Sequence, residues 1–205
     1  MRFLLISMLG GLMSCRPALQ PRQPAAVDVA CINKFKPHFT SDLYDASVDV
    51  IGKHISGLVL FKMMPDSAMR IVFTNEAGIK FFDFGFQGDG KFSAHYVIKQ
   101  LNRKLVVKTL RKDFELTMMS RVGKEQPEAY FVKDELRFSF AGKKETDWVV
   151  TDAGCSTLLR LEQGTEEKKK TNVRLFGKPG HVPDSIFINH LNFNMVIKLK
   201  RLDRL

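Results

Sequence analysis

The sequence predicts an α+β fold: a strongly curved antiparallel sheet, shaped like an incompletely closed half-barrel, with one long amphipathic helix packed on or across it. Three observations favour this class. Short stretches with period-two alternation of apolar and polar residues recur from about Leu43 onward. Turn sequences separate these stretches. One stretch near the middle of the chain changes to a helical period before strands resume, which is typical of α+β folds.

The first half of the domain is expected to be an antiparallel meander. The turn sequences Pro65-Asp66-Ser67 and Gln87-Gly88-Asp89-Gly90 punctuate it, and the second closes a tight hairpin. Alternation predicts strands within residues 43–50, 55–63, 69–74, 79–86 and 91–98.

The helix is expected to start after Asn102, acting as N-cap, and to run to about Met119. At about 100° per residue it has an apolar face and a basic face, so its apolar face should lie against the sheet. The apolar face holds Val106, Val107, Leu110, Phe114 and Met118, and the basic face holds Lys104, Lys108, Arg111 and Lys112. Strands are then expected within residues 136–141, 147–151, 156–163, 170–176 and 194–201.

The N-terminus has the pattern of an export signal. Arg2 precedes an uncharged apolar run over residues 3–13, which is shorter than the roughly 20 residues that span a bilayer. The run ends in Leu12-Met13-Ser14-Cys15, which resembles the bacterial lipobox, although Met13 replaces the usual small residue. The resemblance implies cleavage between Ser14 and Cys15 and acylation of Cys15. The alternatives are an ordinary secretory signal or a buried N-terminal helix, with Cys15 incidental.

These features divide the chain into three parts. Residues 1–14 are the expected signal peptide, and residues 15–41 are the lipidated N-terminus with a proline-rich linker containing Pro17, Pro21 and Pro24. Residues 42–205 are one β-rich domain with a single core.

The charge of the chain indicates its class of partner. Lys and Arg number 32 against 22 Asp and Glu, and loss of Arg2 with the signal leaves 31 − 22 = +9. An exported protein rarely meets nucleic acid, so we expect no nucleic-acid partner; an anionic membrane surface is the better match. The basic helix face therefore has two interpretations: it is solvated, or Lys104, Lys108, Arg111 and Lys112 contact anionic headgroups.

No motif for catalysis or metal binding is present. The sequence lacks a nucleophile elbow, a zinc-protease helix, a Cys-x-x-Cys pair and a glycine-rich phosphate loop. The five histidines are scattered, and Asp83 among phenylalanines faces either solvent or a basic partner. We therefore expect a non-enzymatic protein with no metal and no cofactor. Cys31 and Cys155 either pair in an oxidising compartment or stay unpaired, and the sequence leaves both options open.

Phenylalanines crowd the strands before the helix. Phe82, Phe84 and Phe86 share one strand face, while Ile79 and Phe81 make the other face apolar too. One interpretation is a strand that is simply covered on both faces. The other is a hollow that accepts acyl chains, lined by Phe73, Phe82, Phe84, Phe86 and Phe92.

The whole domain, from about Leu43 to Leu205, resembles the superfamily of the periplasmic lipoprotein carrier and the outer-membrane lipoprotein receptor (LolA/LolB-like). The resemblance is one of architecture: an exported, lipid-anchored, basic chain with a curved sheet and a helix lid. It implies non-enzymatic transfer of lipid or lipoprotein acyl chains by a monomer at the periplasmic face of the outer membrane. It also implies a membrane-contact loop, for which Met63-Met64 is the nearest counterpart. The alternative is a protein-binding subunit of an envelope complex, without a ligand cavity.

Overall fold

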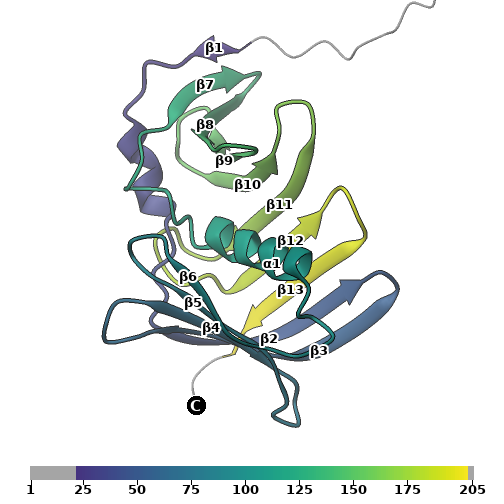
Figure 1. Ribbon diagram of the computed structural model, residues 1–205. Coiled ribbons are helices and arrows are strands. Elements are labelled where there is room, and N and C mark those ends of the chain that lie inside the picture. The colour runs from purple at the N-terminus through teal and green to yellow at the C-terminus, as the bar shows by residue number, and fades with distance from the viewer. Residues whose placement is uncertain (1–21, 203–205) are drawn as a thin grey trace, which may run out of the picture.

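A computed structural model shows how the chain folds and describes residues 22–202. Within this range one antiparallel sheet of 13 strands surrounds a single α-helix (Figure 1). The predicted α+β class with a curved sheet is therefore confirmed. The helices are η1 (Val29–Phe35, a 3-10 helix) and α1 (Lys104–Thr117). The strands are β1 (Gln23–Pro24), β2 (Ser41–Val50), β3 (Lys53–Met63), β4 (Met69–Thr74), β5 (Lys80–Phe86), β6 (Phe92–Val97), β7 (Glu128–Val132), β8 (Glu135–Ala141), β9 (Thr146–Asp152), β10 (Leu158–Gly164), β11 (Lys169–Phe176), β12 (Ser185–His190) and β13 (Met195–Arg201).

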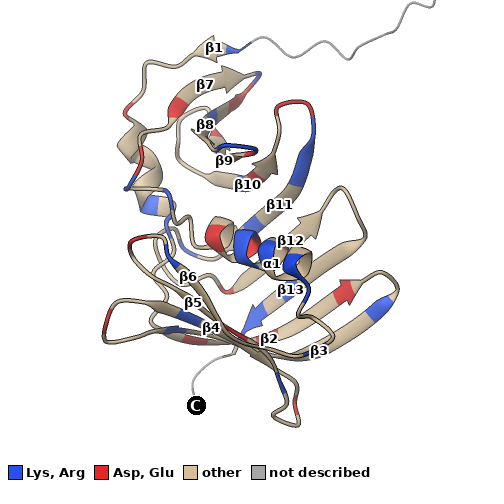
Figure 2. Cartoon of the chain, viewed as in Figure 1, with Lys and Arg blue, Asp and Glu red and all other residues tan. Residues whose placement is uncertain are grey.

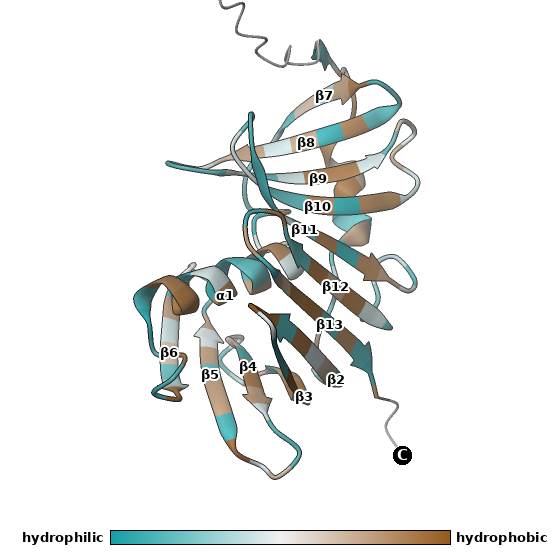
Figure 3. Ribbon diagram, turned by 90° about the vertical axis from the view of Figure 1, so that its right-hand side faces the viewer, coloured by the Kyte–Doolittle hydropathy of each residue, from teal (hydrophilic) through white to brown (hydrophobic). Residues whose placement is uncertain are grey.

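The order of the strands explains the shape. The sheet runs β1-β7-β8-β9-β10-β11-β12-β13-β2-β3-β4-β5-β6, so β1 and β6 are its two edges and the barrel is not closed. Two meanders meet where β13 pairs with β2, for example Ile197 opposite Val48. The sheet curves around α1, which lies on its concave side between the two halves (Figures 1 and 3).

The core occupies the concave side of the sheet. In β4 the residues Met69, Ile71 and Phe73 are buried and their neighbours along the strand are half-buried, as period-two alternation predicts. β5 differs, because every residue from Phe82 to Phe86 is buried. On its outer face, however, this strand carries Asp83 and Gly85 rather than a second apolar layer.

The described residues of the expected linker, 22–41, pack on the domain. β1 pairs with β7, and η1 buries Ile32 and Phe35 against the core. The pairing of cysteines that the sequence left open is present: Cys31 and Cys155 form a disulfide with their Cα atoms 6.4 Å apart. Since it joins residues 124 positions apart, it constrains a long loop of the unfolded chain.

The structure departs from three local predictions. Asn102 was the wrong N-cap: its backbone N–H donates to the carbonyl of Ile98, so it belongs to the preceding turn, and Arg103 caps α1 without a side-chain hydrogen bond. Strands β7 and β12 were not expected. Each is a short apolar run that begins within two residues of a proline, and the proline predicted a loop at that point instead of a strand.

Candidate functional site

One side of α1 is aromatic. The Phe114 ring lies at the centre of a contact between the helix and strands β3 and β5. Its centroid is 5.9 Å from that of Phe61, 5.8 Å from that of Phe82 and 6.5 Å from that of Phe86. These edge-on and tilted geometries are the ones that aromatic pairs prefer. The contact contains no polar atom, so it has no directional requirement.

The five phenylalanines predicted to line a cavity lie together next to this contact. Phe82 stacks on Phe84 at 4.4 Å, and Phe73 contacts Phe82 at 5.6 Å. Phe92 on the edge strand contacts Phe84 at 5.2 Å and Phe86 at 5.3 Å. Four of the five are buried and Phe92 is half-buried. The rings contact one another, and α1 contacts three of them: Phe82 and Phe86 through Phe114, and Phe92 through Arg111.

The other side of α1 is polar and faces the second half of the sheet. Asp113 is buried, and its Oδ2 lies 3.0 Å from Nε2 of His190 on β12. Burial raises the pKa of Asp113, while the hydrogen bond and charge of His190 act to lower it. The Phe193 ring packs over the imidazole at 4.6 Å. This pair could not be predicted from the sequence, because Asp113 lies within the helix pattern and His190 is 77 positions away.

A third member, Thr171, completes a Thr-His-Asp arrangement. Its Oγ1 lies 3.4 Å from Nδ1 of His190. All three side chains are buried between α1 and strands β11 and β12. A nucleophile and its base need a space in which a reacting atom can sit. The arrangement therefore holds the helix in place, and the expectation of a non-enzymatic protein stays a prediction.

Glu145 adds a second polar link between the same elements. Its carboxylate accepts hydrogen bonds from Lys112 of α1 and, at 2.7 Å, from Lys170 of β11. Burial acts to raise the pKa of Glu145, but the two ammonium groups together hold it below its ordinary value. The polar side of α1 is thus fixed by directed contacts at Asp113 and at Lys112.

The four basic residues predicted to meet headgroups separate into two pairs. Lys104 and Lys108 are exposed. Arg111 donates to Glu115 at 2.7 Å and lies over the Phe92 ring, and Lys112 binds Glu145. Only the first pair is therefore available to an external anion in this conformation, and Figure 2 shows these cations along α1.

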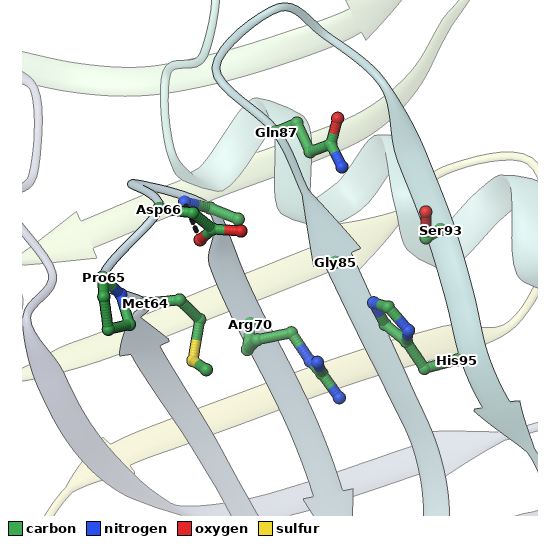
Figure 4. A pocket seen from close by; sticks show the side chains of 9 residues that line it. Met64, Pro65, Asp66, Arg70, Gly85, Gln87, Ser93 and His95 are labelled. Carbon is green, nitrogen blue, oxygen red and sulfur yellow. Dashed lines mark hydrogen bonds between the residues drawn. The ribbon is translucent and has the colours of Figure 1, made fainter.

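The predicted loop Met63-Met64 lies between β3 and β4. Met63 is exposed, and Met64 lines a pocket of about 260 Å³ on the outer face of the sheet. Figure 4 shows the pocket, whose floor is Gly85. His95 lies directly over this glycine. A Cβ atom at position 85 would be only 2.7 Å from Nε2 of His95, so the imidazole occupies the space that a larger residue would need. A register shift between Asp83 and Phe84 sets His95 beside this floor.

Asp83, the polar residue among phenylalanines, meets a basic partner. Its carboxylate accepts two hydrogen bonds from Arg70, each 2.8 Å long, and one from Lys80 at 3.1 Å. Burial raises the pKa of Asp83, but these donors outweigh it and leave the pKa below its ordinary value. One of the two predicted alternatives is thereby confirmed, and the carboxylate is an ion-pair partner on the outer face.

The described residues hold neither a metal-binding group nor a membrane-spanning helix. Residues 22–202 contain no group of three or more His, Cys, Asp or Glu side chains placed to hold a metal ion. In the same range no helix has the length and hydrophobicity needed to cross a membrane. Ser14 and Cys15, the predicted cleavage and lipidation residues, lie outside the described residues.

No protein-family model matches the sequence, and no curated protein matches it. Solved structures are similar in fold. One is a DUF1329 family protein from Desulfovibrio piger, with 9% identity and a TM-score of 0.47 over 85% of this chain and 89% of that chain. Another is a domain from Vibrio parahaemolyticus named for outer membrane lipoprotein sorting, with 7% identity, the same TM-score and the same coverage.

Proposed function

We propose that this chain is a lipid-anchored, non-enzymatic protein of the bacterial outer membrane that binds or transfers acyl chains of lipids or lipoproteins. One observation carries the proposal: the apolar ring contacts of Phe114 on α1 with the phenylalanines of β3 and β5, at the open side of an unclosed sheet. An acyl chain can replace ring–ring contacts there without leaving a buried polar group unpaired.

The energetics of such an exchange are favourable. Each methylene that leaves water gains about 0.8 kcal/mol, so a chain of several methylenes offsets the loss of a few aromatic contacts of about 1 kcal/mol each. The directed contacts of Asp113 and Lys112 would hold the opposite side of the helix while the aromatic side opens. Transfer then consists of acyl chains leaving this contact for a bilayer.

The anchor is the second part of the proposal. Acylation of Cys15 would supply several chains, and durable attachment needs at least two membrane signals. Six residues lie between Cys15 and Arg22, the first described residue, so these two positions are at most about 25 Å apart. The domain would thus stay close to its membrane. Cys15→Ala should abolish incorporation of labelled fatty acid, and unchanged labelling would refute the anchor.

Lipid retention tests the binding activity. We expect native mass spectrometry of the purified protein to show bound phospholipid or fatty acid, and we expect a fluorescent fatty acid to bind after delipidation. Phe92→Ala should weaken this binding, because Phe92 is the cluster member on the edge strand. Phe176→Ala is the matched control, since Phe176 is a partly exposed phenylalanine outside the cluster. Protein free of lipid that also fails to bind the probe would exclude acyl-chain binding.

One observation favours a second candidate function. The rings of the cluster contact one another closely, with Phe82 and Phe84 stacked at 4.4 Å, as in a filled core. A protein-binding subunit of an envelope complex would have such a core and no ligand space. The same two measurements distinguish the candidates, because this alternative predicts neither retained lipid nor probe binding.

A further inference from the structure

Four chain segments lie toward one end of the sheet, which we call the helix-start end. They are the turns at residues 51–52, 75–79 and 191–194 and the segment 98–108 that leads into α1. The backbone N–H of Ile51 donates to the carbonyl of Asn194 at 3.0 Å, so two of the turns touch. Thr74 lies opposite Leu58, and the N–H of Ile98 donates to Phe81, which brings the other two segments to the same end. Figure 3 views the molecule from this side.

Each of these segments exposes a large aliphatic side chain. Turns and helix starts usually carry polar residues at such positions. Single exposed apolar residues are ordinary, but here four separate segments present one each at the same end. The exposed fractions are 76% for Ile51, 75% for Leu105, 54% for Ile79 and 52% for Leu191. At the opposite end of the sheet the exposed apolar side chains reach 50% at most, at Phe176.

Positive charge accompanies these apolar side chains. Five cations at the helix-start end are exposed, and none is in an ion pair with any residue in the range 22–202: Lys53, Lys99, Arg103, Lys104 and Lys108. One exposed acid, Glu76, lies in the turn at residues 75–79. The opposite end also holds exposed lysines outside ion pairs, among them Lys62 and Lys200, whereas its Lys91 and Arg201 pair with Asp89 and Asp184. The helix-start end therefore combines the four most exposed large apolar side chains of the described residues with an excess of unpaired positive charge.

We propose that the helix-start end is a docking face for an anionic phospholipid bilayer. Isolated aliphatic tips can enter the headgroup region while the surrounding cations meet phosphates. A protein interface would instead favour a contiguous apolar centre with aromatic anchors and few lysines. The inference rests on the proposed function, because it concerns the face by which the anchored domain would meet its membrane.

This face competes with the predicted loop Met63-Met64, which lies at the opposite end of β3 from Ile51. The two locations require opposite orientations of the domain on the membrane. A measurement of which end meets lipid therefore decides between them.

The test uses the acylated protein in vesicles of phosphatidylethanolamine and phosphatidylglycerol. A fluorophore is placed on single cysteines introduced at Ile51, Leu105, Met63 or Phe176, with the native disulfide closed. Lipids brominated near the headgroup should quench the labels at Ile51 and Leu105 several-fold more than those at Met63 and Phe176. Quenching at Met63 but not at Ile51 and Leu105, or equal quenching at all four positions, would overturn the proposal.

Charge variants complete the test. Lys104→Gln with Lys108→Gln should lower quenching at Ile51 to the level of the Phe176 label, and neutral phosphatidylcholine vesicles should do the same. Lys62→Gln with Lys200→Gln, exposed lysines on β3 and β13, is the matched control and should change nothing. Loss of quenching in the control pair as well would contradict a role for this face, and so would quenching at Ile51 that arises only in native membranes containing proteins.

Failure of the docking face and failure of acyl-chain binding give different results. Lipid retention is measured on the same preparations by native mass spectrometry. Retained lipid with no quenching at Ile51 rejects the docking face alone. Quenching at Ile51 without any retained lipid supports the docking face and rejects acyl-chain binding.

Discussion

The two sides of α1 are held to the sheet by different physics. Toward β3–β6 the helix contributes Phe114, which packs on other rings without a hydrogen bond. Toward β11 and β12 it contributes Asp113 and Lys112, which make directed polar contacts. Apolar contacts tolerate sliding and exchange of partners, whereas a buried polar pair is costly to break. The comparison separates a side held by directed polar contacts from a side held by apolar packing, and only the second kind of contact could exchange its partner for an acyl chain, as the proposed function requires.

The largest expected effect comes from removing the aromatic contact. Phe114→Ala should lower the free energy of unfolding by about 4 kcal/mol, because it deletes a buried ring and leaves a cavity between α1 and β5. Urea denaturation followed by circular dichroism measures the change. Phe176→Ala should stay within about 0.5 kcal/mol of the original protein. Equal losses for the two variants would show that the aromatic side does not hold the helix.

Breaking the polar side should cost somewhat less. His190→Ala leaves Asp113 buried without its partner, and we expect a loss of about 3 kcal/mol in the free energy of unfolding. His181→Ala, an exposed histidine, is the control. The double variant with Asp113→Asn should be less destabilised than the sum of the two single variants, because they share one interaction. Strict additivity would mean that the pair is not coupled.

Asp113 should also make stability depend on pH. Its pKa is higher in the folded protein than the ordinary value of 3.8, so the folded state binds more protons between these two values. This contribution to the free energy of unfolding therefore falls as the pH rises through that window. Asp113→Asn should remove this component of the pH dependence. Urea unfolding at several pH values measures this change. If the free energy of unfolding of the variant falls with pH as steeply as that of the original protein, this assignment is wrong.

The smallest expected effect is the pH dependence that Glu145 contributes, and its sign is opposite to that of Asp113. The pKa of Glu145 is below its ordinary value of 4.5, so its contribution is present above that pH and is lost as the pH falls through the folded-state value. Glu145→Gln should cost about 1 kcal/mol at neutral pH and nothing in acid. Urea unfolding at both pH values measures this difference. Glu76→Gln, at an exposed turn, is the control. If Glu145→Gln lowered the free energy of unfolding equally at every pH, ionisation of the Glu145 carboxylate would not be the cause.

Local patterns were sufficient to predict much of the fold. The strands of the first meander and the helix follow directly from apolar periodicity, and Phe114 was placed on the inner helix face. The polar side of α1 was beyond such patterns, since Asp113 and His190 meet only after β12 folds back over the helix. The disulfide likewise depends on η1 lying over the turn that holds Cys155. Contacts between distant segments depend on tertiary packing, which no window of sequence contains.

Charge gave a partial prediction of the site. Periodicity grouped Lys104, Lys108, Arg111 and Lys112 on one helix face, but the acidic partners of the last two come from different positions: Glu115, one turn later in the helix, and Glu145, on a distant loop. Which cations stay free is a property of the assembled surface. The same applies to Ile51 and Leu191, whose shared end of the sheet follows from strand register.

The central claim is that the aromatic side of α1 opens to admit acyl chains while the polar side stays in place. Spin labels on Lys108→Cys and Lys62→Cys measure the distance between the helix and the outer face of β3 by pulsed electron resonance. Added phospholipid should produce a population with a longer distance, while a pair on Lys62→Cys and Lys200→Cys within the sheet should not change. A helix-to-sheet distance that is the same with and without phospholipid would contradict the claim.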